Sequence, residues 1–449
     1  MNISFYNLGC KVNLADISRI AKQFEELGHS VVEFEEKSDI VLINTCTVTH
    51  RADADCRKIV RRALRRSPEA FVGVLGCYAQ LQPEQLAKIE GVDAVIGTKH
   101  KFEIPKLIEN FHKNKSTEIF VSDLDDAPFH TSAVSDNSGR TRAVLKLQDG
   151  CDYHCSFCTI PLARGGSRSM PFEQIAGELE QLQKDGYREV VLSGINLGDY
   201  KTPDGKKFVD ALKLIDEKSG DLRIRISSIE PNLLSEEVLE VVANSKNIVP
   251  HFHIPLQSGS QELLRKMKRR YKATYYHDLV LRIKEVMPHC CIGVDVIVGF
   301  PGETDELAQE TYDFLKGLPV SYLHVFTYSE RENTKAAKMT GVVPHDVRKE
   351  RTHQLRDLSD KKRIEFDKSQ VGTDRVVIPE MYNEQNGMWR GWTENYVNVI
   401  FPAPEDLDQV PHRITLTEMV ESRVFGKLTE LKTSKKLTAD KGLALPVLG

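Results

Sequence analysis

Six of the nine cysteines in this 449-residue chain fall into two groups of three. The compact triplet is Cys151, Cys155 and Cys158, in the run Gly-Cys-Asp-Tyr-His-Cys-Ser-Phe-Cys. The dispersed triplet is Cys10, Cys46 and Cys77, each at the end of a short apolar run. A closed structural zinc site takes four ligands, whereas a 4Fe-4S cluster held by three cysteines keeps one iron open for chemistry. Three thiolates in each group therefore favour two reactive iron–sulfur sites.

Strand-like runs lead into the dispersed triplet, at residues 3–8, 39–44 and 71–75, with helical patterns between them. Strands that alternate with helices predict a parallel sheet, in which the carboxyl ends of the strands share one edge. We therefore expect the three cysteines to meet at that edge. The alternative is that they are ordinary buried cysteines. It is disfavoured because all three stand at equivalent strand ends.

The other three cysteines have structural positions. Cys56 shares one side of a helical pattern with apolar neighbours such as Val60, and Cys290 and Cys291 open an apolar strand. An odd number of cysteines, without a basic leader or an apolar run of membrane-spanning length, argues against a secreted disulfide framework. We expect a cytoplasmic protein that does not contact membranes. The net charge of −4 gives no global nucleic-acid signature.

One predicted helix, over residues 56–66, nevertheless has a strongly basic face. Its cations are Arg57, Lys58, Arg61, Arg62, Arg65 and Arg66. A charge run is usually only a solvated surface, but six cations without an intervening acid exceed what solubility needs. We therefore consider these six residues a candidate RNA-binding site that contacts phosphates. Residues 265–270 form a second basic cluster of the same kind.

A second alternation of strands and helices follows a polar linker at residues 123–140. Its strand candidates are residues 143–147, 189–193, 222–226, 252–255, 292–298 and 322–327. Six strand–helix units predict a parallel barrel or part-barrel with its active site at the carboxyl ends of the strands. The compact triplet follows the first of these strands, at that rim. Zinc with His154 as a fourth ligand is the alternative, but no second cysteine pair lies nearby.

The end of the chain changes to short strands, at residues 375–379, 396–401 and 414–420, after a long polar helix at residues 344–368. This pattern predicts a small β-barrel of OB type, a fold often used on nucleic acid. Trp389, Trp392 and Tyr396 could stack on bases or form its core. Residues 371–430 carry ten acidic side chains against five Lys or Arg, an acidity that favours a protein substrate over RNA.

The motif Cys-x3-Cys-x-Phe-Cys at residues 151–158 resembles the radical-SAM signature. With the dispersed triplet upstream, the chain resembles the radical-SAM methylthiotransferases along nearly its whole length. Residues 8–13 (Leu-Gly-Cys-Lys-Val-Asn) and 44–49 (Asn-Thr-Cys-Thr-Val-Thr) look like the MtaB branch. Isopentenyl-adenosine enzymes more often carry Gly-Cys-Gln-Met-Asn, and ribosomal-protein enzymes Gly-Cys-Pro-Lys-Asn.

The resemblance implies an α/β fold with three domains. Residues 1–122 would form an N-terminal open parallel-sheet domain, residues 141–370 a radical-SAM (βα)6 partial barrel, and residues 371–432 a TRAM β-barrel. The implied reaction adds a methylthio group to carbon 2 of an adenosine beside the tRNA anticodon, a base that already bears a threonylcarbamoyl group. An electron donor such as flavodoxin or ferredoxin would be a partner.

Roles for the two triplets also follow from the resemblance. The cluster of the compact triplet would bind S-adenosylmethionine and cleave it reductively, and the cluster of the dispersed triplet would hold the inserted sulfur. Loops at the strand ends would line the S-adenosylmethionine pocket. Their candidate residues are Ser193, Gly194, Asn196, Ser228, Glu230, Gln257, Gly299 and Glu303. Gly-rich strand ends suit this role because they let a ligand approach the backbone closely.

Three alternatives remain: the same chemistry on isopentenyladenosine in tRNA, the same chemistry on an aspartate of a ribosomal protein, and an iron–sulfur electron carrier. The basic helix and the Lys11-Val12 pair favour RNA. Two clusters in two α/β domains, one of them on a barrel rim, argue against an inert carrier. We therefore expect the active site in the cleft between the first two domains.

Overall fold

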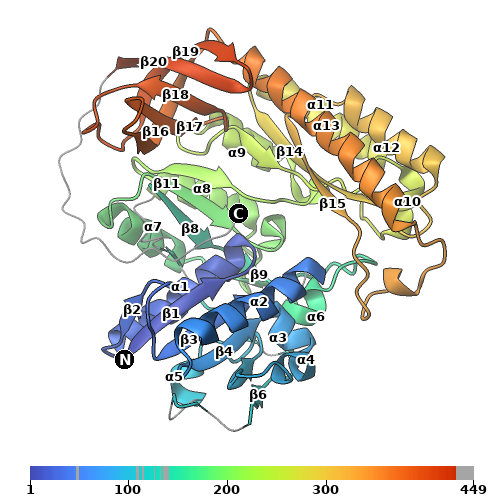
Figure 1. The fold of residues 1–449 in the computed structure, drawn as a ribbon. Helices are drawn as coiled ribbons and strands as arrows, with labels where there is room; N and C mark the ends of the chain where they lie inside the picture. The colour runs from blue at the N-terminus through green and yellow to red at the C-terminus, as the bar shows by residue number, and fades with distance from the viewer. Residues whose placement is uncertain are drawn as a thin grey trace.

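The computed structural model describes residues 1–46, 50–107, 111–113, 116–125, 127–131, 133–134 and 141–430. These residues form three units, drawn in Figure 1 in blue, in green to orange, and in red. Parts of the predicted linker and residues 431–432 of the predicted third domain lie outside the described residues. No helix within the described ranges is both long enough and apolar enough to cross a membrane.

The N-terminal unit is a parallel sheet of six strands in the order β2-β1-β3-β4-β5-β6. The strands are β1 (Asn2–Asn7), β2 (Ser30–Val32), β3 (Ile40–Thr45), β4 (Phe71–Gly76), β5 (Ala94–Ile96) and β6 (Glu118–Phe120). The helices are α1 (Lys11–Glu26), α2 (His50–Arg66), α3 (Cys77–Leu81), α4 (Pro83–Ala87) and α5 (Ile104–Leu107). The predicted parallel sheet is confirmed, and its strands β1, β3 and β4 lie within one residue of the predicted bounds.

Helices cover both faces of this sheet because successive residues of a strand point to opposite sides. In β3, Leu42 packs in the cluster that includes Ile17 of α1, whereas Val41 and Ile43 pack in the cluster that includes Cys56 of α2. Strands buried on both faces read as continuous apolar runs, which is the pattern that identified them in the sequence. Cys56 is completely buried in this core, as expected for a structural cysteine.

The central unit is a partial barrel of six parallel strands, as predicted. They are β8 (Arg142–Lys146), β11 (Glu189–Ser193), β12 (Arg223–Ile226), β13 (His251–His253), β14 (Cys291–Val298) and β15 (Tyr322–Thr327). Single bridges from Ile224 to Ile248 and from Ser228 to His253 connect β12 to β13. The short strand β7 (Ala133–Val134) lies antiparallel to β8.

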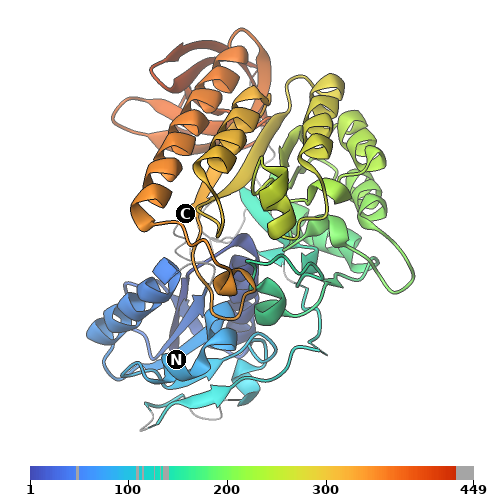
Figure 2. The same ribbon diagram turned by 90° about the vertical axis from the view of Figure 1, so that its right-hand side faces the viewer.

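Helices cover the outside of the partial barrel (Figure 2). They are α7 (Gln174–Lys184), α8 (Phe208–Lys218), α9 (Glu236–Asn244), α10 (Gln261–Lys266), α11 (Ala273–Val286), α12 (Asp305–Gly317) and α13 (His345–Ser369). Between β8 and α7 lie the strands β9 (Gln148–Asp149) and β10 (Arg168–Ser169) and the helix α6 (Ile160–Arg164). The compact triplet lies between β9 and α6.

The C-terminal unit is a closed barrel in the order β16-β17-β18-β20-β19. Its strands are β16 (Asp374–Asn383), β17 (Met388–Thr393), β18 (Asn398–Pro402), β19 (His412–Val420) and β20 (Arg423–Glu430). The predicted small β-barrel is confirmed. Trp389 belongs to its core, where the indole N–H donates to the carbonyl oxygen of Pro404 (2.8 Å).

A buried carboxylate, Glu189, connects the partial barrel to this C-terminal barrel. It pairs with Arg142, Arg223 and Arg225 at N–O distances of 3.2, 3.2 and 2.9 Å. The two arginines of β12 also donate to C-terminal backbone oxygens: Arg223 to Trp392 and Arg225 to Glu394, both at 3.1 Å. The rings of Trp392 and Tyr396 stack on each other at 4.5 Å and face Arg142 and Arg225. These two aromatic side chains therefore take part in a domain interface.

A second buried carboxylate, Asp16 of α1, connects the N-terminal unit to the partial barrel. It is completely buried and pairs with Lys101 (2.6 Å), Lys146 (2.7 Å) and Arg164 (3.0 Å). Arg164 also pairs with Asp149 at 2.7 Å. Burial alone would raise the pKa of Asp16, but the three cations outweigh it and hold that pKa well below its ordinary range.

We predict that Asp16→Asn destabilises the protein by about 3–5 kcal/mol, because it leaves buried cations without their carboxylate. The contribution of Asp16 is fully present above pH ~4 and is lost as pH falls toward its lowered pKa. Urea denaturation at pH 7 measures the effect, with the exposed Glu26→Gln on the same helix as control. Equal stability of the two variants would show that Asp16 does not hold this interface together.

Candidate active site

The structure places the dispersed triplet at the carboxyl ends of three adjacent strands, as the sequence predicts. Cys10 precedes α1, Cys46 follows β3, and Cys77 begins α3. Gly9, directly before Cys10, has a φ of +148°. A β-carbon on Gly9 would lie 3.1 Å from the β-carbon of Cys46. The bare backbone of a glycine thus lets the Cys10 loop approach Cys46.

Arg164 reaches this edge from the partial barrel. Its positive charge acts on the Cys77 thiol, and its guanidinium donates to the side-chain oxygen of Asn13. Asn13 in turn donates to the carbonyl oxygen of Thr45 (3.0 Å), next to Cys46. Burial raises the pKa of the Cys77 thiol, and Arg164 opposes that rise. A residue only six positions after Cys158 therefore supports the other triplet.

In the compact triplet each sulfur accepts one hydrogen bond. The donors are the backbone N–H of Tyr153 to Cys151 (3.4 Å), the guanidinium of Arg269 to Cys155 (3.2 Å), and the backbone N–H of Ile160 to Cys158 (3.4 Å). Burial raises the pKa values of the Cys151 and Cys158 thiols to about 12. Binding of a metal as thiolates therefore has to release protons.

Gly150 sets the path of the loop that carries the compact triplet. Its φ is +74°, and a β-carbon there would lie 1.9 Å from the carbonyl oxygen of Gly166. Only glycine fits such a close approach of two backbones. The backbone N–H of Cys151 then donates to the carbonyl oxygen of Gly165 (3.1 Å), which fixes the start of the loop.

Two cavities meet at Cys158. One, of about 480 Å³, is lined by all three cysteines of the compact triplet together with residues such as Gln80 of the N-terminal unit and Thr334. The other, of about 220 Å³, lies over the inner face of the barrel and is lined by residues that include Gln257 and Phe326. Ligands at the compact triplet can thus contact both the N-terminal unit and the barrel interior.

Arg269 is a site residue that the sequence interpretation missed. Residues 265–270 were expected to be a phosphate-binding surface, and this is wrong for Arg269. Its guanidinium is buried between the Cys155 sulfur and the carboxylate of Glu230. Its neighbour Arg270 lies over the ring of Tyr153, 3.7 Å from the centroid. No local pattern distinguishes the buried arginine from its exposed neighbours, because only the tertiary fold brings it to the cysteine.

Asn196 has the clearest sign of a ligand among the predicted S-adenosylmethionine contacts. It is 2% exposed, and neither its amide oxygen nor its amide nitrogen has a hydrogen-bond partner among the described residues. The backbone N–H of Asn196 donates to the side-chain oxygen of Gln148 (2.8 Å). A β-carbon on Gly194 would lie 3.1 Å from the same oxygen, so Gly194 leaves room for this side chain. Buried amides are normally satisfied, so this one fits a polar group of a bound cofactor. Ser193, just before them, is also buried.

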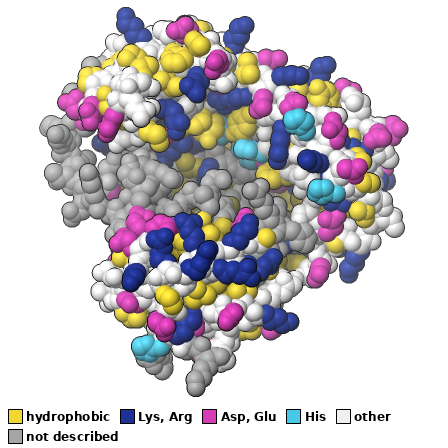
Figure 3. Space-filling model, viewed as in Figure 1, with side chains coloured by type: hydrophobic (Ala, Val, Ile, Leu, Met, Phe, Trp, Pro, Cys, Tyr) yellow, Lys and Arg dark blue, Asp and Glu magenta, His cyan; other side chains and the backbone are white. Residues whose placement is uncertain are grey.

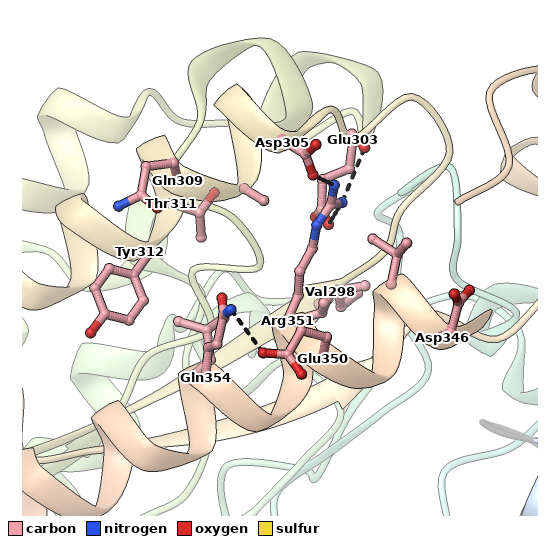
Figure 4. Close-up of a pocket in the computed structure, with 14 residues that line it drawn as sticks. Val298, Glu303, Asp305, Gln309, Thr311, Tyr312, Asp346, Glu350, Arg351 and Gln354 are labelled. Carbon is pink, nitrogen blue, oxygen red and sulfur yellow. Dashed lines mark hydrogen bonds and ion pairs between the residues drawn. The ribbon is translucent and has the colours of Figure 1, made fainter. Parts of the chain in front are cut away.

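The other predicted contacts divide between two places. Gln257, with φ of +72°, lines the cavity over the barrel interior, and Ser228 bridges to His253 at the end of β12. Glu303 instead accepts hydrogen bonds from the Gly299 N–H (2.9 Å) and from Arg351 (2.7 Å). Figure 4 shows this carboxylate in a groove between α12 and α13. The structure therefore does not bring Glu303 to the cavities at the cysteines.

The six predicted RNA-binding cations of α2 are all exposed. Figure 3 shows a dense patch of Lys and Arg over the N-terminal unit. Lys58 pairs with Asp55, and Arg62 and Arg66 both pair with Glu35. The remaining three, Arg57, Arg61 and Arg65, form no salt bridge to any described residue, so their charge is available for phosphates.

The two triplets differ from a mononuclear metal site. Nowhere in the described part of the chain do three His, Cys, Asp or Glu side chains converge closely enough to bind one metal ion. A single zinc ion requires ligands about 2.0–2.3 Å from the metal. Three cysteines that border one cavity, each with a donor on its sulfur, fit a larger cluster, whose sulfurs such hydrogen bonds commonly tune.

Comparison with known families supports this assignment of the two halves. Residues 145–315 match the model of the Radical SAM superfamily, and residues 2–97 match that of Uncharacterized protein family UPF0004. The first range contains the compact triplet and the second contains the dispersed triplet. A radical-SAM domain implies one 4Fe-4S cluster and S-adenosylmethionine.

Curated relatives match nearly the whole chain. It is 40% identical to the threonylcarbamoyladenosine tRNA methylthiotransferase MtaB of Bacillus subtilis, covering 90% of this chain and 91% of the relative. It is 38% identical to the MtaB of Aquifex aeolicus (89% and 96% covered). It is 36% identical to the tRNA-2-methylthio-N(6)-dimethylallyladenosine synthase of Fusobacterium nucleatum (80% and 83% covered).

Solved structures support the fold. The radical S-adenosylmethionine methyltransferase TsrM of Kitasatospora setae superposes with a TM-score of 0.56 at 14% identity, over 75% of each chain. At that identity the likeness shows a shared architecture and nothing of the substrate. Together with the identity and coverage of the curated relatives, the matches lead to one conclusion: the chain belongs to the radical-SAM methylthiotransferase family, and it matches MtaB relatives at up to 40% identity.

Proposed function

We propose that this protein adds a methylthio group to carbon 2 of N6-threonylcarbamoyladenosine beside the anticodon of tRNA. The observation that carries the proposal is a contact between the two triplets. Arg164, just after the compact triplet, donates to Asn13, which donates to the backbone beside Cys46 of the dispersed triplet. Two reactive clusters held at one domain junction suit a single substrate atom that needs both. The threonylcarbamoyl specificity rests on the printed activity of the MtaB relatives.

Cys151, Cys155 and Cys158 would hold the 4Fe-4S cluster with an open iron, and Cys10, Cys46 and Cys77 would hold the second cluster. Together with S-adenosylmethionine these groups supply the radical chemistry that an unactivated aromatic C–H requires. Around them Arg269 donates to a cluster cysteine while Glu230 balances its charge. Asn196 offers a buried amide to the cofactor, and Gly150 keeps the cysteine loop close to its neighbouring turn.

The partners we infer follow from the same chemistry. Reductive cleavage of S-adenosylmethionine needs an electron, and we assign its delivery to a donor of the flavodoxin or ferredoxin type. Nine cysteines without a disulfide suit the reducing cytoplasm. The basic face of α2 would bind phosphates of the tRNA.

Nucleoside mass spectrometry of tRNA tests the proposed function. A strain that lacks this protein should lose 2-methylthio-N6-threonylcarbamoyladenosine and accumulate its precursor, and the gene on a plasmid should restore the product. Loss of the methylthio derivative of dimethylallyladenosine instead would assign the other tRNA branch. An unchanged tRNA profile would refute activity on tRNA.

Iron content separates the two triplets. The anaerobically reconstituted protein should bind about eight irons if both clusters are 4Fe-4S. We predict that Cys155→Ala and Cys77→Ala each reduce this to about four irons. Cys155→Ala should abolish cleavage of S-adenosylmethionine, whereas Cys77→Ala should retain cleavage and lose only methylthio transfer. Cys56→Ala is the matched control, because Cys56 is buried in the hydrophobic core and belongs to neither triplet. Zinc in place of iron would contradict the proposal.

The α2 patch makes a separate prediction. Replacing Arg57, Arg61 and Arg65 with Gln should weaken tRNA binding and reduce the slope of log K against log salt by roughly 2 to 3, because each lost phosphate contact removes 0.7–0.9. The same replacement of Lys349, Lys361 and Lys368, exposed on α13, is the charge-matched control. Equal salt slopes for both triple variants would show that the α2 face does not contact the RNA.

A further inference from the structure

Three strands of the partial barrel place a set of polar side chains on its inner face. His253 of β13 pairs with Asp295 of β14 (Nε2–Oδ1 2.9 Å), and Asp295 is the register partner of His324 on β15. The rings of His253 and His324 lie 5.2 Å apart. His324 is exposed, and the side chains of His253 and Asp295 are each nearly one-fifth exposed. Barrel interiors are normally filled with apolar side chains, so this accessible polar face is adapted to a ligand.

Lys11 of the N-terminal unit is within electrostatic reach of these strands. It follows Cys10 and is exposed to solvent, although protein lies on most sides of it. We call the space between Lys11 and the polar face formed by His253, Asp295 and His324 the chamber. The charge of Lys11 acts on both His251 and His324. Within the described residues its ammonium forms no ion pair. Burial, followed by the charges of Arg225 and Arg142, lowers the pKa of Lys11 to about 8.

The chamber has an excess of positive charge. Near it Arg142, Arg223 and Arg225 surround the carboxylate of Glu189, and Arg142 also pairs with Glu380 (2.9 Å). With Lys11 these are four cations against three carboxylates, those of Glu189, Glu380 and Asp295. Burial lowers the pKa values of His251 and His324, so these two rings are neutral N–H donors near pH 7. Enclosed cations are costly without a counter-charge, and an anionic ligand group would supply it.

The chamber continues into the smaller of the two cavities at Cys158, the one of about 220 Å³ over the inner face of the barrel. Asp295 lines that cavity together with Cys158 and Phe326. Phe326 is 46% exposed, which is unusual for a phenylalanine and leaves a ring face on which a base can stack. An apolar ring near a cluster cysteine, followed by a cationic chamber, is complementary to a base that carries an anionic substituent.

We propose that Lys11 and His324 bind the carboxylate of the threonylcarbamoyl group, with the adenine against Phe326. The His253–Asp295 pair lies beside the carboxylate and can accept the hydroxyl of the threonyl moiety. This assignment rests on the proposed function, because it names the residues that distinguish the threonylcarbamoyl base from an adenosine with a neutral substituent.

A pair of anticodon stem–loop RNAs tests the assignment. One carries N6-threonylcarbamoyladenosine, and the other carries the same nucleoside with its carboxylate replaced by a carboxamide. Fluorescence anisotropy gives the Kd of each RNA for the cluster-loaded full chain, and mass spectrometry gives the methylthio transfer. The ratio of the two Kd values measures recognition of the charge.

The wild-type protein should bind the carboxylate RNA about 10–100-fold more tightly than the carboxamide RNA, the range for hydrogen bonds to charged groups. Lys11→Gln should bring this ratio close to one, and Lys11→Arg should retain most of it. His324→Ala should reduce the ratio several-fold, whereas His353→Ala, an exposed histidine of α13, should leave it unchanged. Iron content of each variant verifies that the neighbouring Cys10 cluster is intact.

A wild-type ratio near one, or a Lys11→Gln variant that keeps the wild-type ratio, would overturn the assignment. So would equal weakening of both RNAs by Lys11→Gln, because that indicates a phosphate contact. These outcomes differ from failure of the proposed function. In that case the wild-type protein would not methylthiolate the threonylcarbamoyladenosine RNA at all, whatever the behaviour of the variants.

Discussion

The structure depends on one buried group of charges, in which Asp16 of the N-terminal unit meets Lys146 and Arg164 of the partial barrel. Removing these ions from water is costly, and only their close mutual pairing repays the cost. The pairing therefore specifies one relative position of the two units. Because Arg164 also donates to Asn13, which holds the backbone beside Cys46, the contact that joins the units also sets the dispersed triplet against the barrel.

The same principle operates at the other end of the barrel, with a different outcome. Glu189 and its three arginines join the C-terminal barrel through the backbone oxygens of Trp392 and Glu394. Glu380 pairs with Arg142 at 2.9 Å and Glu394 with Arg375 at 3.4 Å, so part of the acidity of this domain serves its own contacts. That acidity is therefore weaker evidence against an RNA substrate than it is in the sequence alone.

The strands and the two triplets could be predicted because their signals are local. Apolar runs that end in Gly-Cys or Thr-Cys place Cys10, Cys46 and Cys77 on one edge without further information. The charged groups that connect domains could not be predicted, since Asp16 and Arg164 are 148 residues apart and each looks like an ordinary helical residue. Arg269 and Glu303 show the same limit, because the sequence of a loop does not show which distant residues its charged side chains will contact. The strands β2, β5 and β6 were too short, at three residues each, to give a pattern.

The buried ion pairs at the domain junction have a consequence for how a large RNA can be handled. A gap held by such pairs cannot open like a hinge without exposing several unpaired charges. A nucleotide in a folded loop would reach it only by rotating out of its stack, as in enzymes that act on everted bases. Selectivity would then depend partly on how easily a loop gives up one base, a property of the RNA rather than of any side chain.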